Sequence, residues 1–206
     1  SLESIFTRDF KGIVEMDDIY LNFNQKGRKI GRIIFDRNLR GISNQKTNVM
    51  VMSDRYGTLD MKVTTLGRMS VEDLERVIDV RRLNDDNIIC SDSHRSITSY
   101  VSELGLKHKT INVNKGQHVV EGIYHVQKVN SLTREFKDWL KLNFNNVSTK
   151  YLQNYLFWFK MEKILKGETD GLDNFLKYCL QDETTIDRKN NIENEYQEFL
   201  EESLSE

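Results

Sequence analysis

The sequence of 206 residues contains no proline, only two cysteines and no long apolar run. Cys90 and Cys179 lie far apart, with no CxxC pair and no Cys/His cluster, which excludes a disulfide framework and a zinc finger. Because no stretch of about 18 apolar residues exists, we expect no membrane span, and we expect no secretory signal. The cysteine usage is typical of a reducing compartment, so the predicted location is the cytoplasm.

The remaining composition is that of a globular domain. Hydrophobic residues make up 38%, charged residues 30% and aromatic residues 10% of the chain, and this length can enclose a core without disulfides or structural metals. The first residue is serine and not methionine, which favours a fragment of a longer protein.

The net charge of -2 hides two strongly charged regions. Between Lys26 and Lys46, seven Lys or Arg face the single acid Asp36, a local net charge of +6. From Gln181 onward, nine acids face two basic residues, a net charge of -7. We interpret the first region as a basic loop. For the acidic tail, a solvated helix is preferred over a partner-binding element or an inhibitor that competes with DNA.

Hydrophobic periodicity predicts a mixed α/β sheet with helices added at the C-terminal end. The Ser70/Asp73 pair predicts a helix start at Val71. Strands are expected over residues 12–23, 47–52, 58–66, 87–90 and 109–113. Helices are expected over residues 71–83, 96–104, 124–142, 149–165 and 171–181.

Two aspartates fall on strands that a sheet can bring together. Asp17 lies within the first strand, and Asp92 follows the buried strand at 87–90. Two adjacent carboxylates repel each other unless a cation lies between them, so the pair is typical of a Mg²⁺ or Mn²⁺ site. On the long helix, Asn130 offers an amide oxygen. Lys137 follows two turns later on the same face, where its charge suits a phosphate.

Each of these residues also has an ordinary structural interpretation. An aspartate after a strand is often a turn or cap residue, and Asp92 precedes a helix that it can cap. Asn130 can be a surface amide and Lys137 a solvated charge. The basic loop can equally be a solvated segment without a ligand, so composition and spacing leave both interpretations open.

Whole segments carry a more specific signal. The sequence reads GIVEMDDIY over 12–20, ICSDS over 89–93, YHVQKVNSLTREFKDWL over 124–140 and VSTKYLQNYLFWF over 147–159. In this order they resemble the transposases of ISXO-type bacterial insertion sequences, which are relatives of the eukaryotic Merlin elements. The resemblance extends from about Gly12 to Phe159, and the segment with Asn130 and Lys137 is its most specific part.

The resemblance implies an RNase H-like catalytic domain with a DDE-type site, in which Asn replaces the third acid and a Lys follows. On this basis Asp17, Asp92 and Asn130 are the expected metal ligands, and Lys137 completes the catalytic set. Asp18, where the family commonly has Glu, and Lys128, where it often has Asn, are departures.

The implied activity is metal-dependent cleavage and transfer of DNA strands with two Mg²⁺ or Mn²⁺ ions. The implied partners are transposon-end and target DNA. Holding two ends favours a homodimer, and the location becomes the bacterial cytoplasm near the nucleoid. Alternatives are a non-catalytic DNA-binding remnant and a general RNase H-like nuclease.

The resemblance also divides the chain. We expect a catalytic domain over residues 1–165, with the basic loop at 24–46, and a C-terminal helix and acidic tail over 166–206. The expected DNA-binding residues are Lys26, Arg28, Lys29, Arg32, Arg37, Arg40 and Arg134. The zinc-ribbon and helix-turn-helix region that usually recognises transposon ends is not found in this sequence, so end specificity is expected to lie outside it.

Overall fold

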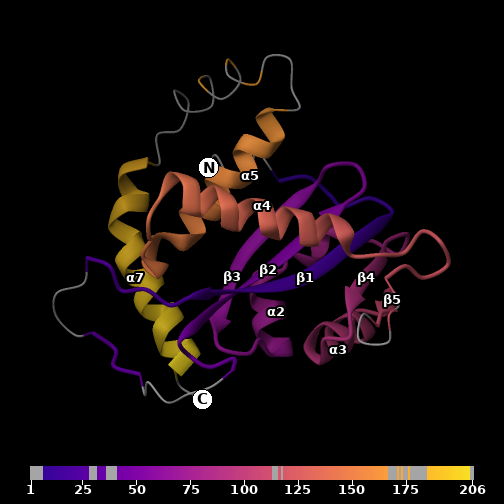
Figure 1. Ribbon diagram of the computed structural model, residues 1–206, viewed down its shortest axis with the longest axis horizontal. Coiled ribbons are helices and arrows are strands. Elements are labelled where there is room, and N and C mark those ends of the chain that lie inside the picture. The colour runs from indigo at the N-terminus through magenta and orange to yellow at the C-terminus, as the bar shows by residue number, and fades with distance from the viewer. Residues whose placement is uncertain are drawn as a thin grey trace.

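The computed structural model describes residues 7–27, 32–35, 41–112, 116, 118–166, 171, 173, 176 and 185–204, with the side chains of 185–190 excepted. Its centre is a five-stranded sheet with the order β3-β2-β1-β4-β5 (Figure 1). The strands are β1 (Ile13–Asn22), β2 (Lys46–Asp54), β3 (Leu59–Leu66), β4 (Ile88–Asp92) and β5 (Lys107–Ile111).

The sheet is mixed. β1 pairs antiparallel with β2, which pairs antiparallel with β3. On its other side β1 pairs parallel with β4, and β4 pairs parallel with β5. An antiparallel meander continued by two parallel strands, each reached through a helix, is the RNase H-like arrangement, which confirms the expected fold class.

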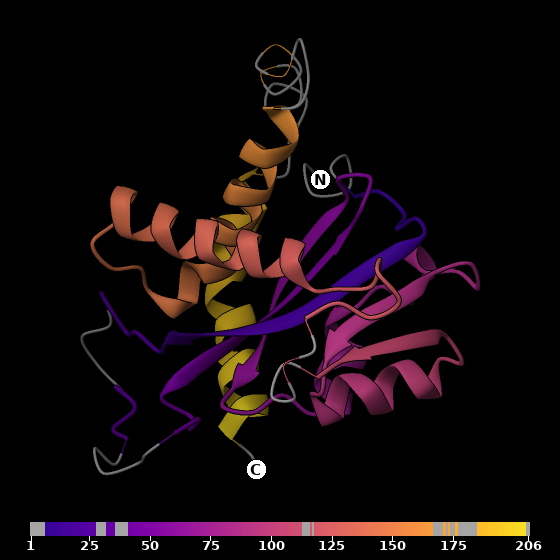
Figure 2. The ribbon, with the colours of Figure 1, turned by 45° about the vertical axis from the view of Figure 1, so that its right-hand side comes forward.

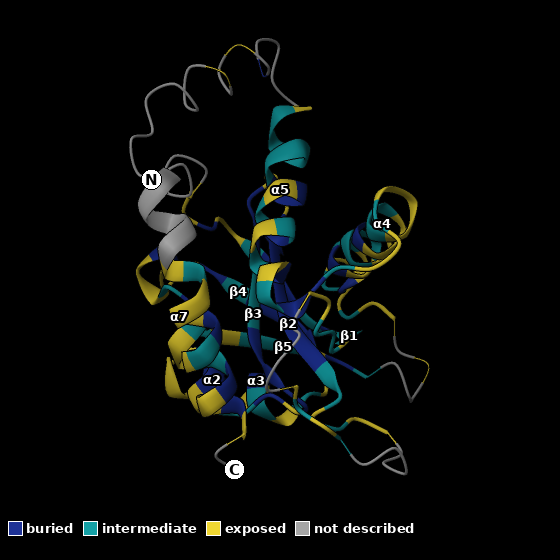
Figure 3. Cartoon of the chain, turned by 90° about the vertical axis from the view of Figure 1, so that its left-hand side faces the viewer, coloured by how far each residue is buried: buried dark blue, intermediate teal, exposed yellow. Residues whose placement is uncertain are grey.

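Helices cover both faces of the sheet (Figures 2 and 3). On one face lie α2 (Val71–Val77) and α3 (Arg95–Glu103), and on the other α4 (Gln127–Asn143) and α5 (Leu152–Leu165), preceded by the short helix η3 (Thr149–Tyr151). Alternation along β1 separates two cores: Val14 and Met16 pack with α2 and α3, whereas Ile19 packs with α4 and α5. None of the described helices combines the length and hydropathy needed to cross a bilayer.

The helix predicted over residues 71–83 is shorter in the structure. The capping box of Ser70 and Asp73 is present, but α2 ends at Val77, not at residue 83. The chain then becomes extended, and Asp79 caps a separate short helix, η1 (Val80–Arg82). Residues 171–181 lie mostly outside the described part of the chain, so the helix expected there stays a prediction.

The acidic C-terminal segment forms α7 (Thr185–Leu204), which lies along the β3 edge of the sheet (Figure 1). Tyr196 and Leu200 are buried against Leu66, and the Leu66 amide donates a hydrogen bond to Ser203 Oγ at 3.2 Å. One face of this helix is therefore packed, not solvated as the charge pattern suggested. It covers an edge strand that would otherwise expose unpaired backbone groups.

A buried ionic cluster joins the sheet to two distant helices. Asp60 of β3 pairs with Arg82 of η1 and lies 3.5 Å from Lys160 of α5. All three residues are at least nine-tenths buried. Arg82 also donates to the Arg8 carbonyl oxygen and covers the Phe10 ring at 4.7 Å. Removing one member therefore leaves charges that water cannot reach.

We expect Asp60→Asn to lower the free energy of unfolding by about 3–5 kcal/mol, because two buried cations lose their partner. Lys166→Ala is the control, since it removes an exposed pair with Glu162 at 3.9 Å and should cost no more than about 1 kcal/mol. Urea denaturation of both variants measures the difference. Equal losses of stability would contradict the assigned role of the cluster.

Candidate active site

Asp17 and Asp92 lie side by side at the centre of the sheet. Parallel pairing of β1 with β4 places Met16 opposite Ser91. Asp17 directly follows Met16, and Asp92 directly follows Ser91. Asp17 is on the face of β1 that α4 covers, because it alternates along the strand with Glu15 and Ile19, which both contact that side. The pairing register alone thus brings together two carboxylates that are 75 residues apart in the chain.

The two carboxylates interact electrostatically. Burial, followed by the negative charge of Asp92, raises the pKa of Asp17 from 3.8 to about 7. The Asp18 amide opposes this shift by donating a 2.9 Å hydrogen bond to Asp17 Oδ1, and the ammonium of Lys137 also lowers the pKa. The charges of Asp92 and Lys137 thus both act on Asp17. Their role as a catalytic set stays a prediction.

Helix α4 carries the other two predicted site residues. Asn130 is exposed in its first turn, and Lys137 is exposed two turns later. The charge of Lys137 lowers the pKa of Asp17. Among the described contacts, none joins Asn130 to either aspartate. Thr133, between them, holds a buried hydroxyl without a hydrogen-bond partner. The position of Asn130 depends on how the first turn of α4 packs against the sheet.

That docking depends on Glu15, whose role the sequence did not reveal. Its fully buried carboxylate accepts hydrogen bonds from the Lys128 amide at 2.7 Å and the Val129 amide at 3.2 Å. A carboxylate at a helix N-terminus satisfies unpaired amides and complements the helix dipole. Arg55 lies 3.1 Å and His125 3.3 Å from its other oxygen. Glu15 fixes the start of α4 two residues along the strand from Asp17.

Side chains around the helix start complete this attachment. Lys128 donates from its ammonium to the Asp54 carbonyl oxygen at 2.5 Å, which ties α4 to the end of β2. His125 accepts a hydrogen bond from the amide of Gln127, the first residue of α4, at 3.3 Å. Its ring thus satisfies one backbone donor at the helix start. The one sign of this attachment in the sequence was Glu15 itself, an acid two positions before Asp17 in a strand that is otherwise largely apolar.

The turn after β4 holds Asp92 in place. Its Oδ1 accepts a hydrogen bond from the His94 amide at 3.0 Å, directly before α3. The ordinary interpretation of Asp92 as a turn residue is thus correct for one oxygen. The hydrogen bond orients the carboxylate and leaves the second oxygen for another ligand.

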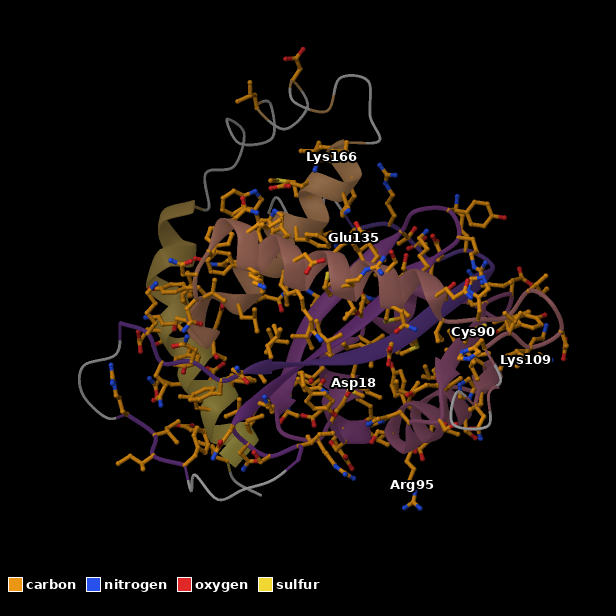
Figure 4. The ribbon with its side chains drawn as sticks, viewed as in Figure 1. Asp18, Cys90, Arg95, Lys109, Glu135 and Lys166 are labelled. Atoms are coloured by element: carbon orange, nitrogen blue, oxygen red, sulfur yellow. The ribbon has the colours of Figure 1, made fainter. Side chains whose placement is uncertain are left out.

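Asp18 belongs to a different environment, on the opposite side of β1 from α4 (Figure 4). It accepts a hydrogen bond from the Asn48 amide nitrogen at 2.5 Å, and His94 Nε2 lies 4.0 Å away. Burial and the Asp18 charge raise the pKa of Tyr20. Asp18 contributes to the field at Asp17 but does not face the same space.

The donor set fits a divalent cation only in part. Among the described residues, no group of three or more His, Cys, Asp or Glu side chains could hold a metal ion. The carboxylates of Asp17 and Asp92 nevertheless repel each other, and a cation bound between them would attract both. Asn130 and an oxygen supplied by a bound phosphate are the remaining candidates for a complete coordination sphere.

The expected DNA-binding residues are described only in part. Lys26, Arg32 and Arg134 are exposed, and Lys26 donates to the Asn146 carbonyl oxygen at 3.3 Å. Within the loop, Ile33 exchanges two 2.8 Å hydrogen bonds with the Gln25 side chain, which hold the residue next to Arg32 against the start of the loop. Four of the expected residues lie outside the described part of the chain: Arg28, Lys29, Arg37 and Arg40.

The raised pKa predicts an unusual pH dependence of stability. Because the folded state prefers protonated Asp17, metal-free protein should lose stability as the pH rises from about 4 to about 7, and the loss is complete above that range. Asp17→Asn removes the cost and should stabilise the protein at pH 8 by at most about 4 kcal/mol, but hardly at pH 4. Urea denaturation in EDTA at both pH values measures this, and an equal effect at both would contradict the assignment.

Comparisons with known proteins identify a family for most of the chain. Residues 9–160 match the ISXO2-like transposase domain. No curated protein matches the chain. Among solved structures, a chain of the simian T-cell lymphotropic virus intasome in complex with the PP2A regulatory subunit B56 gamma is 14% identical, with a TM-score of 0.40 over 73% of this chain and 49% of that one.

Two structures of the Mos1 transposase are also similar. The paired-end complex with the left transposon end is 14% identical with a TM-score of 0.29, over 77% of this chain and 55% of that one. The pre-cleavage transpososome is 13% identical with a TM-score of 0.28, over 75% and 54%. The chain thus spans about half the length of these proteins. With the family match covering most of its length, this chain belongs to the ISXO2-like transposase domain family.

Proposed function

We propose that this chain is the catalytic domain of a DDE-type transposase that cleaves DNA strands and joins them to a target. The observation that supports the proposal is that Asp92, on the neighbouring strand, and Lys137, on helix α4, both act electrostatically on Asp17. Family membership supports the same reaction class. The proposed catalytic domain comprises residues 1–165, followed by the C-terminal helix and acidic tail at 166–206.

In this proposal Asp17, Asp92 and Asn130 hold Mg²⁺ or Mn²⁺. Two bound ions would activate the attacking oxygen and stabilise the leaving oxygen of a phosphoryl transfer. Because only two of the three ligands carry charge, we expect the ions to bind weakly until a DNA phosphate adds its oxygens. Lys137 places a cation beside the carboxylates, where it binds the phosphate and offsets its negative charge.

The other residues of the site position these groups. Glu15 holds the first turn of α4 through two amides, so Asn130 and Lys137 keep a constant relation to Asp17. The His94 amide orients Asp92. The attacking oxygen comes from water in strand cleavage and from a DNA 3′-hydroxyl in strand joining, so no covalent link between protein and DNA is required.

The DNA path in this proposal follows the cations near the site. The basic loop begins directly after β1, the strand that carries Asp17, and Arg134 lies on α4 between Asn130 and Lys137. Phosphate contacts from these residues would position DNA without reading its sequence. Two chains, each holding one DNA end, would form the homodimer that joining of both ends requires.

Cleavage assays test the proposal directly. Wild-type protein with Mn²⁺ or Mg²⁺ should nick a labelled plasmid that carries the DNA flanking the coding sequence, and it should join a 3′-hydroxyl end to target DNA. Asp92→Ala should lower both rates by at least about 10³-fold, because one metal ligand is removed. Asp86→Ala, an exposed acid before β4, is the matched control and should retain activity.

The products separate the alternatives. Nicking without joining would identify a nuclease, and specific DNA binding without metal-dependent nicking, in folded protein, would identify a binding remnant. Either result would overturn the proposed transposase activity.

The basic loop has its own test. Replacing Lys26, Arg28, Lys29 and Arg32 by serine should reduce the slope of log affinity against log salt by roughly 0.9 for each DNA phosphate that the variant no longer neutralises. Fluorescence anisotropy of labelled duplex DNA between about 50 and 200 mM salt would measure the slope. An unchanged slope would show that the loop does not bind phosphates.

A further inference from the structure

A cavity of about 230 Å³ lies at the C-terminal end of α4, beside the proposed active site. Its apolar lining includes Leu21 of β1, Leu140 of α4, Phe144 directly after α4, and Leu152 of α5. The volume is below the roughly 300–1,000 Å³ of pockets that hold drug-sized ligands. The cavity therefore suits one ring system better than a larger molecule.

The cavity and the carboxylate pair share one residue. Lys137 lines the cavity and also acts on the pKa of Asp17. Leu21 follows Asp17 by four residues and lies on the same face of β1, a separation of roughly 13 Å along the strand. At about 3.4 Å per base step, this is roughly four nucleotides of one DNA strand. A DNA strand that follows β1 from a phosphate at Asp17 would pass the cavity.

The charge around the cavity suits DNA. Lys137 and Lys141 line it, and none of the described lining residues is acidic. Two further lysines attach to its lining: Lys46 donates to Asn22 Oδ1 at 2.5 Å, and Lys26 donates to the Asn146 carbonyl oxygen. A lining of apolar side chains and lysines complements a base and its flanking phosphates better than it complements an apolar protein segment.

The lining is also suited to stacking. The Phe144 ring is held by edge contacts with Trp139, Tyr155 and Trp158, at centroid distances of 5.2, 4.8 and 5.6 Å. A ring fixed in this way loses little freedom when a base stacks on it. The amide side chains of Asn145 and Asn146 at the same cavity offer donors and acceptors that suit a base edge.

We propose that the cavity receives one nucleobase, turned out of the double helix within about four nucleotides of the scissile phosphate. The inference rests on the proposed function, because it assigns the cavity to the DNA that the active site cleaves. Stacking in the cavity would offset part of the cost of unpairing that base. It would also fix the register of the strand at Asp17 and Asp92.

The test uses full-length protein with Asp92→Ala, so that bound DNA stays intact. The DNA is a duplex with 2-aminopurine placed in turn at each of the four positions on either side of the cleavage point. The fluorescence of 2-aminopurine should rise at one position, because an extruded base no longer stacks on its neighbours in the duplex, which quench it. Asn145→Trp fills the mouth of the cavity from an exposed position. It should abolish the rise and weaken DNA binding by about tenfold, or ~1.4 kcal/mol, because the base can no longer stack.

The matched control is Leu142→Trp, since Leu142 is 84% exposed and does not line the cavity. It should keep both the emission and the affinity. Metal-dependent cleavage by the parent protein without a rise at any position would overturn the inference and leave the proposed function intact. A rise that survives Asn145→Trp would also overturn the inference. Absence of both cleavage and DNA binding would overturn the proposed function itself.

Discussion

The parallel pairing of β1 with β4 is the constraint on which the site depends. It places Asp17 and Asp92 next to each other at the centre of the sheet, where burial and like charge raise the pKa of Asp17 to about 7. The fold thus holds two carboxylates in an arrangement that costs stability in the absence of a cation. Such a cost is expected where a protein prepares ligands for a metal and a phosphate.

The helix that covers this pair is attached by the same strand. Glu15 accepts hydrogen bonds from two amides at the start of α4, and Asp17 lies two residues further along β1. One strand therefore carries a proposed ligand and the anchor of the helix that carries Asn130 and Lys137. A shift of β1 would move every part of the site together, which keeps their relative geometry constant.

The two charged regions meet at the other edge of the sheet. Near the basic loop, Phe23, Ile33 and Phe35 join one apolar cluster with Tyr196 and Leu200 of the acidic helix α7. Phe23 and Phe35 contact each other edge to face at 5.3 Å. Apolar contacts with α7 thus hold the described part of the loop.

Sequence by itself was sufficient for the fold class and for the existence of the strands and most helices. It also selected Asp17, Asp92 and Lys137 as candidate site residues, and their catalytic role stays a prediction. Alternation and helical periodicity are local properties that gave the order of the elements, and the family resemblance supplied the RNase H-like arrangement. The end of α2 at Val77 was missed, because it depends on η1 packing Arg82 against Asp60.

Glu15 also looked like an ordinary strand residue, because its partners at 128 and 129 are more than 100 residues away. Only the tertiary structure placed α7 along β3 and formed the cavity beside Lys137, since both require elements from distant parts of the chain to pack together. Local sequence patterns determine which residues share a face, whereas packing decides what that face contacts.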